Sequence, residues 1–228
     1  MDFWEDYYSK HDEAFDWLIR WESPTENKPL KDLLYDQTPI YETGKDGKKV
    51  EVGNKSMLKE EMEILIIGCG TSRLSEELCD EGFEKVTSID FSSTAIKLQK
   101  ERYLGQEDYK ELEFVEMDAR KLQFPDGKFD VVIDKGLMDS MLCSNPGPKN
   151  VQDMLENVHR VLNETGKYIC ISREVEAKRK KHMKKVGKFN WKVQKCPIIK
   201  PIAGPLPARM PRATEIDDKK YFLFVYIC

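Results

Sequence analysis

Glycines and carboxylates occur in this sequence where a small molecule could be held. Gly68 and Gly70 stand in the sequence GCG, directly after an apolar run. Asp90, Asp118 and Asp134 each end a later run of apolar residues. Glycine lets a ligand approach the backbone because it has no Cβ atom, and carboxylates accept hydrogen bonds from hydroxyl and amino groups. The set therefore predicts a site for a polar small molecule.

The position of Asp90 indicates which kind of small molecule could bind. It lies 22 residues after Gly68, where an acid at the end of a second strand can accept hydrogen bonds from ribose hydroxyls. Two alternatives stay open: a plain strand-to-helix turn also needs glycines, and Asp90 could cap the next helix. Ser92 can supply that cap itself.

Asp118 extends the pattern, since a carboxylate there suits an adenine amino group and Ala119 leaves room for the ring. The turn reads GCGTSR and lacks the third glycine of a dinucleotide-binding turn. A rim of acids at the strand ends also suits a cation better than a pyrophosphate. S-adenosylmethionine, a sulfonium nucleoside, meets these conditions.

Alternating strands and helices must position these residues. The apolar patterns predict strands at 64–67, 85–90, 111–118, 129–134, 167–172, 189–196 and 220–228. They predict helices at 72–80 with Thr71 or Ser72 as the cap, from Ser92 onward, at 151–162 and at 174–186. This order predicts an α/β fold with five or six parallel strands, one antiparallel edge strand and helices on both faces.

The 228 residues fit a single domain. Residues 1–21 are rich in aromatic residues. Residues 22–57 are polar, contain three prolines and predict a loop or mobile insertion, and residues 58–228 form the core.

Composition limits the possible partners and metals. The net charge is −4, so no global field favours nucleic acid. The six cysteines form no CxxC pair, which predicts reduced thiols and no metal site. Without an opening signal segment or a long apolar run, we expect a cytoplasmic, monomeric protein that needs no membrane.

The sequence resembles the seven-strand, S-adenosylmethionine-dependent methyltransferases with a Rossmann-like sheet. Within them it is similar to the methyltransferase-like group that modifies lysines of translation elongation factor 1-alpha. The stretches that carry this resemblance are FWEDYY, FDWL, GCGTSRLSEEL, GFEKVTSIDFSS, MDARKLQFPDGKFDVVIDKGLMDSML and VHRVLNETGKYICIS.

The resemblance implies a set of cofactor contacts. Beside the glycines and strand-end acids, they are Trp4, Tyr8, Phe15, Trp17, Cys69, Phe91, Ala119 and Lys135. The aromatic residues of the first segment could form a lid that favours the sulfonium by cation–π attraction. Alternatively, Trp4 and Tyr8 could be a hydrophobic staple onto the sheet.

The resemblance also implies a protein-lysine N-methyltransferase that acts on elongation factor 1-alpha. A small-molecule or RNA methyltransferase and a catalytically silent cofactor-binding scaffold remain alternatives. No residue stands out as a general base, because Asp139 could either orient the amine or cap a helix. The basic run 178–185 could be a solvated helix face or could dock an acidic surface of the partner.

Overall fold

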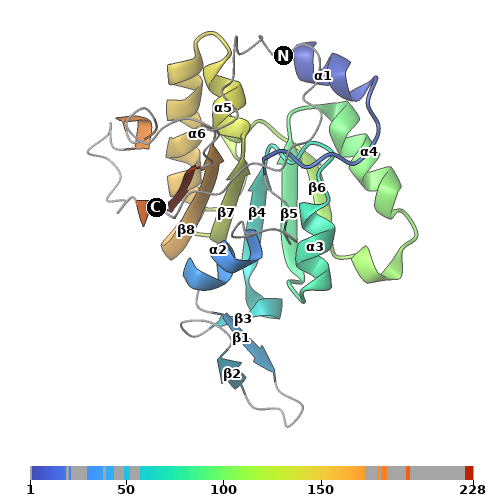
Figure 1. Cartoon of the computed structure of the whole chain (residues 1–228), viewed down its shortest axis with the longest axis vertical. Coiled ribbons are helices and arrows are strands. Elements are labelled where there is room, and N and C mark those ends of the chain that lie inside the picture. The colour runs from blue at the N-terminus through green and yellow to red at the C-terminus, as the bar shows by residue number, and fades with distance from the viewer. Residues whose placement is uncertain are drawn as a thin grey trace, which may run out of the picture.

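The core of the molecule is a sheet of five parallel strands. The computed structural model describes residues 2–18, 21, 30–37, 40–43, 49–51, 57–172, 179, 181–183, 194–195 and 224–227. The parallel strands lie in the order β6-β5-β4-β7-β8 (Figure 1). Their bounds are β4 Glu63–Ile67, β5 Lys85–Asp90, β6 Glu113–Glu116, β7 Phe129–Lys135 and β8 Leu162–Ser172. The α/β prediction is therefore confirmed.

Helices cover both faces of this sheet. Side chains alternate along a strand, so Ile64 and Ile66 enter one buried cluster and Leu65 and Ile67 the other. The first cluster packs against α2 Leu30–Gln37, α3 Leu74–Asp80 and α4 Ser93–Tyr103, and the second against α5 Leu137–Leu142 and α6 Gly147–Val161. Two apolar layers thus hold the strand ends in place.

Element bounds follow the sequence patterns most closely at the centre of the sheet. β5 has the predicted limits, whereas β6 is shorter at both ends. The predicted cap of α3 is wrong: Arg73 occupies the cap position without a side-chain capping hydrogen bond, and Ser72 Oγ accepts from the Leu74 amide at 3.1 Å. The turn after β4 extends two residues further than the pattern predicts, so the helix begins at Leu74 and not at residue 72. Short 3-10 turns occur at Lys59–Glu61, Glu107–Tyr109 and Ala119–Lys121.

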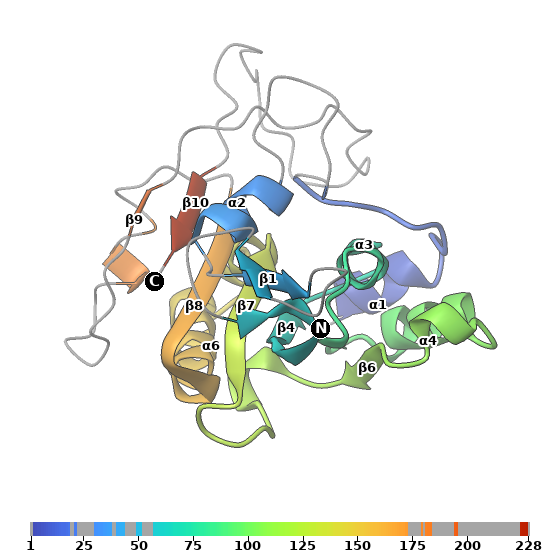
Figure 2. The same cartoon turned by 90° about the horizontal axis from the view of Figure 1, so that it is seen from below.

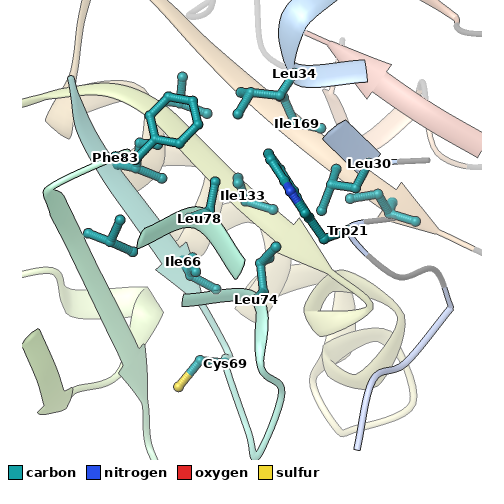
Figure 3. Packing of buried hydrophobic residues seen from close by; sticks show 14 of the residues in the cluster. Trp21, Leu30, Leu34, Ile66, Cys69, Leu74, Leu78, Phe83, Ile133 and Ile169 are labelled. Atoms are coloured by element: carbon teal, nitrogen blue, oxygen red, sulfur yellow. The ribbon is translucent and has the colours of Figure 1, made fainter. Parts of the chain in front are cut away.

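The prediction of a loop over residues 22–57 is wrong where this segment is described. Helix α2 buries Leu30 and Leu34 completely, and both lie near Trp21 in the first cluster (Figure 3). Strands β1 Ile40–Thr43, β2 Lys49–Glu51 and β3 Met57–Leu58 form a separate small sheet in the order β2-β1-β3. Two leucines four residues apart are a weak helix signal beside several prolines and charges, and the sequence pattern alone therefore does not predict this helix.

Two short strands continue the sheet beyond β8. β10 Phe224–Ile227 pairs antiparallel with β8, and β9 Gln194–Lys195 pairs antiparallel with β10 (Figure 2). The antiparallel strand β10 therefore lies between β8 and β9, whereas the sequence predicts it at the edge of the sheet. Either strand of an antiparallel pair can pair with the edge of a sheet, and the sequence pattern does not show which of the two does so. No helix among the described residues is long and apolar enough to cross a bilayer.

Candidate functional site

The glycine turn follows β4 at the middle of the carboxyl edge of the sheet. Gly68 and Gly70 have φ angles of +64° and +52°, a backbone region that favours glycine. A Cβ atom on Gly68 would lie 2.9 Å from Leu137 Cδ1, and one on Gly70 would lie 2.5 Å from Tyr8 Oη. Both glycines are therefore required by conformation and by close neighbours.

Cys69 contributes its backbone to this turn, and its side chain belongs to the core. The Cys69 amide donates to the Ile89 carbonyl at 3.0 Å. The thiol is buried in the first apolar cluster (Figure 3), and burial raises its pKa well above the usual value. The thiol is therefore not a reactive nucleophile.

Asp90 braces the glycine turn from the end of β5. Its Oδ2 accepts from the Gly70 amide and its Oδ1 from the Ser92 amide, each at 2.9 Å. Ser92 Oγ in turn accepts from the Ala95 amide at 3.1 Å and caps α4, as predicted. Burial raises the pKa of Asp90, and the backbone hydrogen bonds oppose this rise. Asp90 is thus a positioned carboxylate that joins the turn to the start of α4.

Asp118, at the end of β6, is bound to a residue that the sequence analysis did not single out. Its carboxylate accepts from the Arg120 amide at 2.9 Å and forms an ion pair with the Arg120 guanidinium at 2.6 Å. Burial raises the pKa of Asp118, but the bonds and charge of Arg120 outweigh this and hold it below its usual range. Arg120 also donates to Asn150 Oδ1 at 2.9 Å. Ala119 is buried beside this group and Phe91, after β5, is half-buried.

Asp134 lies at the end of β7, but its side chain is fully buried. It accepts from the Leu137 amide at 2.7 Å, from the Met138 amide at 3.2 Å and from the Tyr168 hydroxyl at 2.7 Å. These bonds hold the start of α5. The prediction that all strand-end acids line one rim therefore does not extend to Asp134, because its oxygens are turned into the second apolar layer.

Helix α1, Asp2–Tyr8, carries aromatic side chains to the glycine turn. It lies near the start of α4 at the carboxyl edge of the sheet (Figure 1). Trp4 Nε1 donates to Ser140 Oγ at 2.7 Å, and the Trp4 and Tyr8 rings stack with centroids 5.8 Å apart. Tyr8 is buried against Gly70. The sequence resemblance thus selected two side chains that lie at the turn.

The chain continues from α1 along the same turn. The Phe15 amide donates to the Thr71 carbonyl at 3.3 Å. The Trp17 ring meets Phe15 and Trp4 edge to face, with centroid distances of 4.7 and 5.8 Å. Trp4, Tyr8, Phe15 and Trp17 therefore form one connected group of rings.

A buried ion pair fastens this segment to β7. Lys135 Nζ pairs with Asp16 and donates to Ser72 Oγ at 3.1 Å. Both charged side chains are nearly buried, with 7% and 12% of their surfaces exposed. Burial raises the pKa of Asp16, but the charge and hydrogen bond of Lys135 outweigh this, so the pKa is lowered. Lys135 was predicted as a site residue from the sequence, whereas Asp16 was not, because its only signal is its place between two aromatic residues.

Glu5 makes a second attachment, to the start of α4. Its carboxylate accepts from the hydroxyls of Ser92, Ser93 and Thr94, at 2.5, 2.9 and 2.6 Å, and from the Thr94 amide at 3.2 Å. The hydrogen bonds from Ser92 and Thr94 lower the pKa of Glu5 to about 2. Together with the helix N-terminus, these hydroxyls make a favourable place for a carboxylate.

Part of the basic run faces inward. Arg179 and Met183 are buried, and Arg179 pairs with Asp139 and donates to Ser172 Oγ at 2.7 Å. Asp139 is therefore held by Ser172 of β8 and by Arg179. Lys181 is exposed, whereas Lys180, Lys184 and Lys185 lie outside the described residues.

Comparison with known proteins identifies the family. A family model described as "Methyltransferase domain" matches residues 58–219. The chain belongs to this methyltransferase family. The match begins just before β4 and includes all five parallel strands, the glycine turn and the three strand-end acids.

Two mouse methyltransferases and one solved structure illustrate the similarity. The Mus musculus "eEF1A lysine and N-terminal methyltransferase" is 41% identical over 117 residues, which cover 50% of this chain and 16% of that protein. The Mus musculus "EEF1A lysine methyltransferase 4" is 35% identical over 142 residues, covering 59% and 54%. A SAM-dependent methyltransferase from Aquifex aeolicus has the same fold, with a TM-score of 0.50, 15% identity and coverage of 73% and 81%.

The cofactor of this methyltransferase domain is S-adenosylmethionine, and the described residues fit it. A carboxylate has about four acceptor positions, and the Gly70, Ser92 and Phe91 amides use three of those of Asp90. Asp90 therefore retains acceptor capacity for ribose hydroxyls. The bare backbone of Gly70 and the Trp4–Tyr8 stack lie beside it. No group of three or more metal-ligating side chains occurs among the described residues.

Replacement of Glu5 by alanine is expected to loosen α1 from α4. Four accepted hydrogen bonds are lost, so amide exchange over residues 2–8 should be about 3- to 10-fold faster. Because the pKa of Glu5 is lowered to about 2, its contribution is complete above about pH 5 and is lost as the pH falls toward 2.

Asp6→Ala is the matched control for this change. Asp6 lies on the same helix and forms an exposed ion pair with Lys10. Hydrogen exchange measured between pH 6 and 8 should therefore separate Glu5→Ala from Asp6→Ala at every pH. Equal exchange in the two variants would contradict the attachment through Glu5.

Replacement of Asp134 by asparagine is expected to flatten the pH dependence of stability. Burial raises the pKa of Asp134 to about 7, whereas an unfolded aspartate ionises near pH 4. The folded protein then binds the extra proton between these values, so stability falls as the pH rises from about 4 to about 7. Thermal unfolding of both proteins across this range measures the difference, and parallel profiles would contradict it.

Proposed function

We propose that the chain is an S-adenosylmethionine-dependent protein-lysine N-methyltransferase and that its substrate is translation elongation factor 1-alpha. The proposal of this substrate is carried by one observation, the 41% and 35% identity to relatives named as methyltransferases of this factor. Because the chain spans 16% and 54% of those proteins, a direct assay of the chain is required.

The proposed cofactor contacts come from three parts of the carboxyl edge. The turn contributes backbone at Gly68, Cys69 and Gly70. The ends of β5 and β6 contribute Asp90, Phe91, Asp118 and Ala119, of which Asp118 would bind together with Arg120. The first segment and β7 contribute Trp4, Tyr8, Phe15, Trp17 and Lys135. Asp134 acts indirectly, by holding the start of α5 through the Leu137 and Met138 amides.

In methyl transfer to lysine, the main task of the chain is to position the reacting groups, and proton transfer by a side chain is less important. S-adenosylmethionine supplies an activated methyl group when bound. The chain must align the lysine nitrogen with it and exclude water. A lysine ammonium must lose its proton first, and an apolar, aromatic environment near another cation lowers its pKa. The aromatic group of the first segment provides such an environment, and no residue is assigned as a general base.

The number of strands in the sheet, the oligomeric state and the location of the protein are also proposals. We infer that β10 and β9 complete a seven-stranded sheet, and that the chain is a monomer. Elongation factor 1-alpha acts in translation, so the proposed substrate places the enzyme in the cytoplasm. The exposed Lys181 and its basic neighbours in the sequence remain a proposed contact for an acidic part of the partner.

The proposal is tested by methylation of the purified factor. The chain is incubated with elongation factor 1-alpha and S-adenosylmethionine, and the intact factor is then analysed by mass spectrometry. A mass increase in steps of one methyl group on a lysine is expected, and Asp90→Ala should remove it. Labelling of only RNA or small metabolites from a lysate would support the alternative acceptors, and no labelling with intact cofactor binding would support a silent scaffold.

A further inference from the structure

The outer face of α1 presents a row of stacked aromatic rings. Phe3 stacks on Tyr7 with centroids 6.3 Å apart, and Tyr7 stacks on His11 at 4.5 Å. Phe3 is 48% exposed, and His11 is also exposed. Among the described residues, Phe3 and Leu104 are the two exposed large hydrophobic side chains. Single exposed apolar side chains are normal on a protein surface, but an exposed phenylalanine that continues a row of rings suggests a binding surface.

This outer row is continuous with the rings at the glycine turn. Tyr7 meets Trp4 and Tyr8 edge to face, with interplanar angles of 77° and 80°. Trp4 and Tyr8 form the inner row, which contacts Ser140 and lies against Gly70. The aromatic surface therefore runs without a break from solvent to the proposed cofactor site.

The charge around the row selects the kind of partner. Residues 2–18 contain six acids and one lysine, a net charge of −5, whereas the whole chain has −4. The other residues therefore sum to +1, and the negative charge is concentrated in this segment. Asp6, Asp12 and Glu13 are exposed. A row of ring faces bordered by carboxylates attracts cations both through the rings and through the acids.

We propose that the row formed by Phe3, Tyr7 and His11 is the docking surface for the lysine-bearing, cationic segment of the protein substrate. This inference rests on the proposed lysine methylation and adds to it where the substrate binds. The segment lies along the outer row, and its target lysine reaches the inner row at the glycine turn. Side chains that flank the target contact the rings and the acids.

The test compares Phe3→Ser with Leu104→Ser, a matched loss of one exposed apolar side chain. Leu104 is 81% exposed after the end of α4. Steady-state methylation of elongation factor 1-alpha is measured for both. Phe3→Ser should raise the KM for the factor about 3- to 10-fold and leave kcat and calorimetric S-adenosylmethionine binding unchanged. Leu104→Ser should match the parent in all three quantities.

A second variant tests the charge. Asp12→Lys with Glu13→Lys should raise the same KM and reduce its salt dependence, because exposed charges are screened by salt. If the parent methylates the factor and both variants match it, the docking surface is wrong and the proposed function stands. If the parent binds S-adenosylmethionine but leaves the factor unmethylated, the proposed function fails and the docking inference fails with it.

Discussion

Asp90→Ala is expected to weaken S-adenosylmethionine binding by about 100-fold or more. Hydrogen bonds to a charged acceptor contribute about 1.5–3 kcal/mol each, and a ribose offers two hydroxyls. The change also removes the acceptor of the Gly70 and Ser92 amides, so the turn itself loses its brace. Isothermal titration calorimetry of the folded variant measures the effect.

Two further variants separate binding from folding. Asp90→Asn keeps the size of the side chain and one acceptor oxygen, and we expect an intermediate loss of affinity. Asp108→Ala removes an exposed acid elsewhere and should bind as the parent does. Thermal unfolding of each protein shows whether it is folded at the titration temperature. Parent-like affinity in folded Asp90→Ala would remove Asp90 from the cofactor site.

Asp16→Ala is expected to be the most destabilising of the changes considered. It deletes the carboxylate partner of the nearly buried Lys135 ammonium, and breaking a buried pair from one side costs about 3–5 kcal/mol. The lowered pKa of Asp16 means that the pair contributes fully above about pH 4 and that its contribution is lost at lower pH. Chemical denaturation at pH 7 and at pH 3 measures both effects.

Removal of both charges provides the control for this prediction. Asp16→Leu combined with Lys135→Met should regain most of the lost stability, because an apolar pair avoids a buried charge without its partner. Asp6→Ala breaks an exposed pair with Lys10 and should change stability by only about 0–1 kcal/mol. An Asp16→Ala protein as stable as Asp6→Ala would show that the buried pair does not hold the first segment.

The residues at the centre of the sheet could be predicted from local patterns. The apolar run of β4, the glycines after it and Asp90 at the end of β5 are each signalled within a few positions. Ser92 was recognised as the cap of α4 because a hydroxyl directly precedes the helical pattern. Such features depend on the chain's own neighbours, and a parallel sheet then brings the strand ends together.

The remaining site residues depend on contacts between distant parts of the chain. Glu5 bonds to residues 87–89 positions away, and Asp16 bonds to Lys135 across 119 positions. Local sequence cannot reveal such partners. Asp134 shows the opposite error: it fitted the strand-end pattern, but its orientation is set by the α5 amides and the Tyr168 hydroxyl. The burial of α2 was likewise decided by packing against the sheet.

We propose that S-adenosylmethionine binds at the carboxyl edge beneath the first aromatic segment. Hydrogen exchange with and without the cofactor tests it most directly, because it reports on both sides of the site in one experiment. We expect slower exchange at residues 68–72, at 90–95 and across 2–18 when S-adenosylmethionine is added, with little change in the small β2-β1-β3 sheet. Unchanged exchange at 68–72 and 2–18 under saturating cofactor would contradict it.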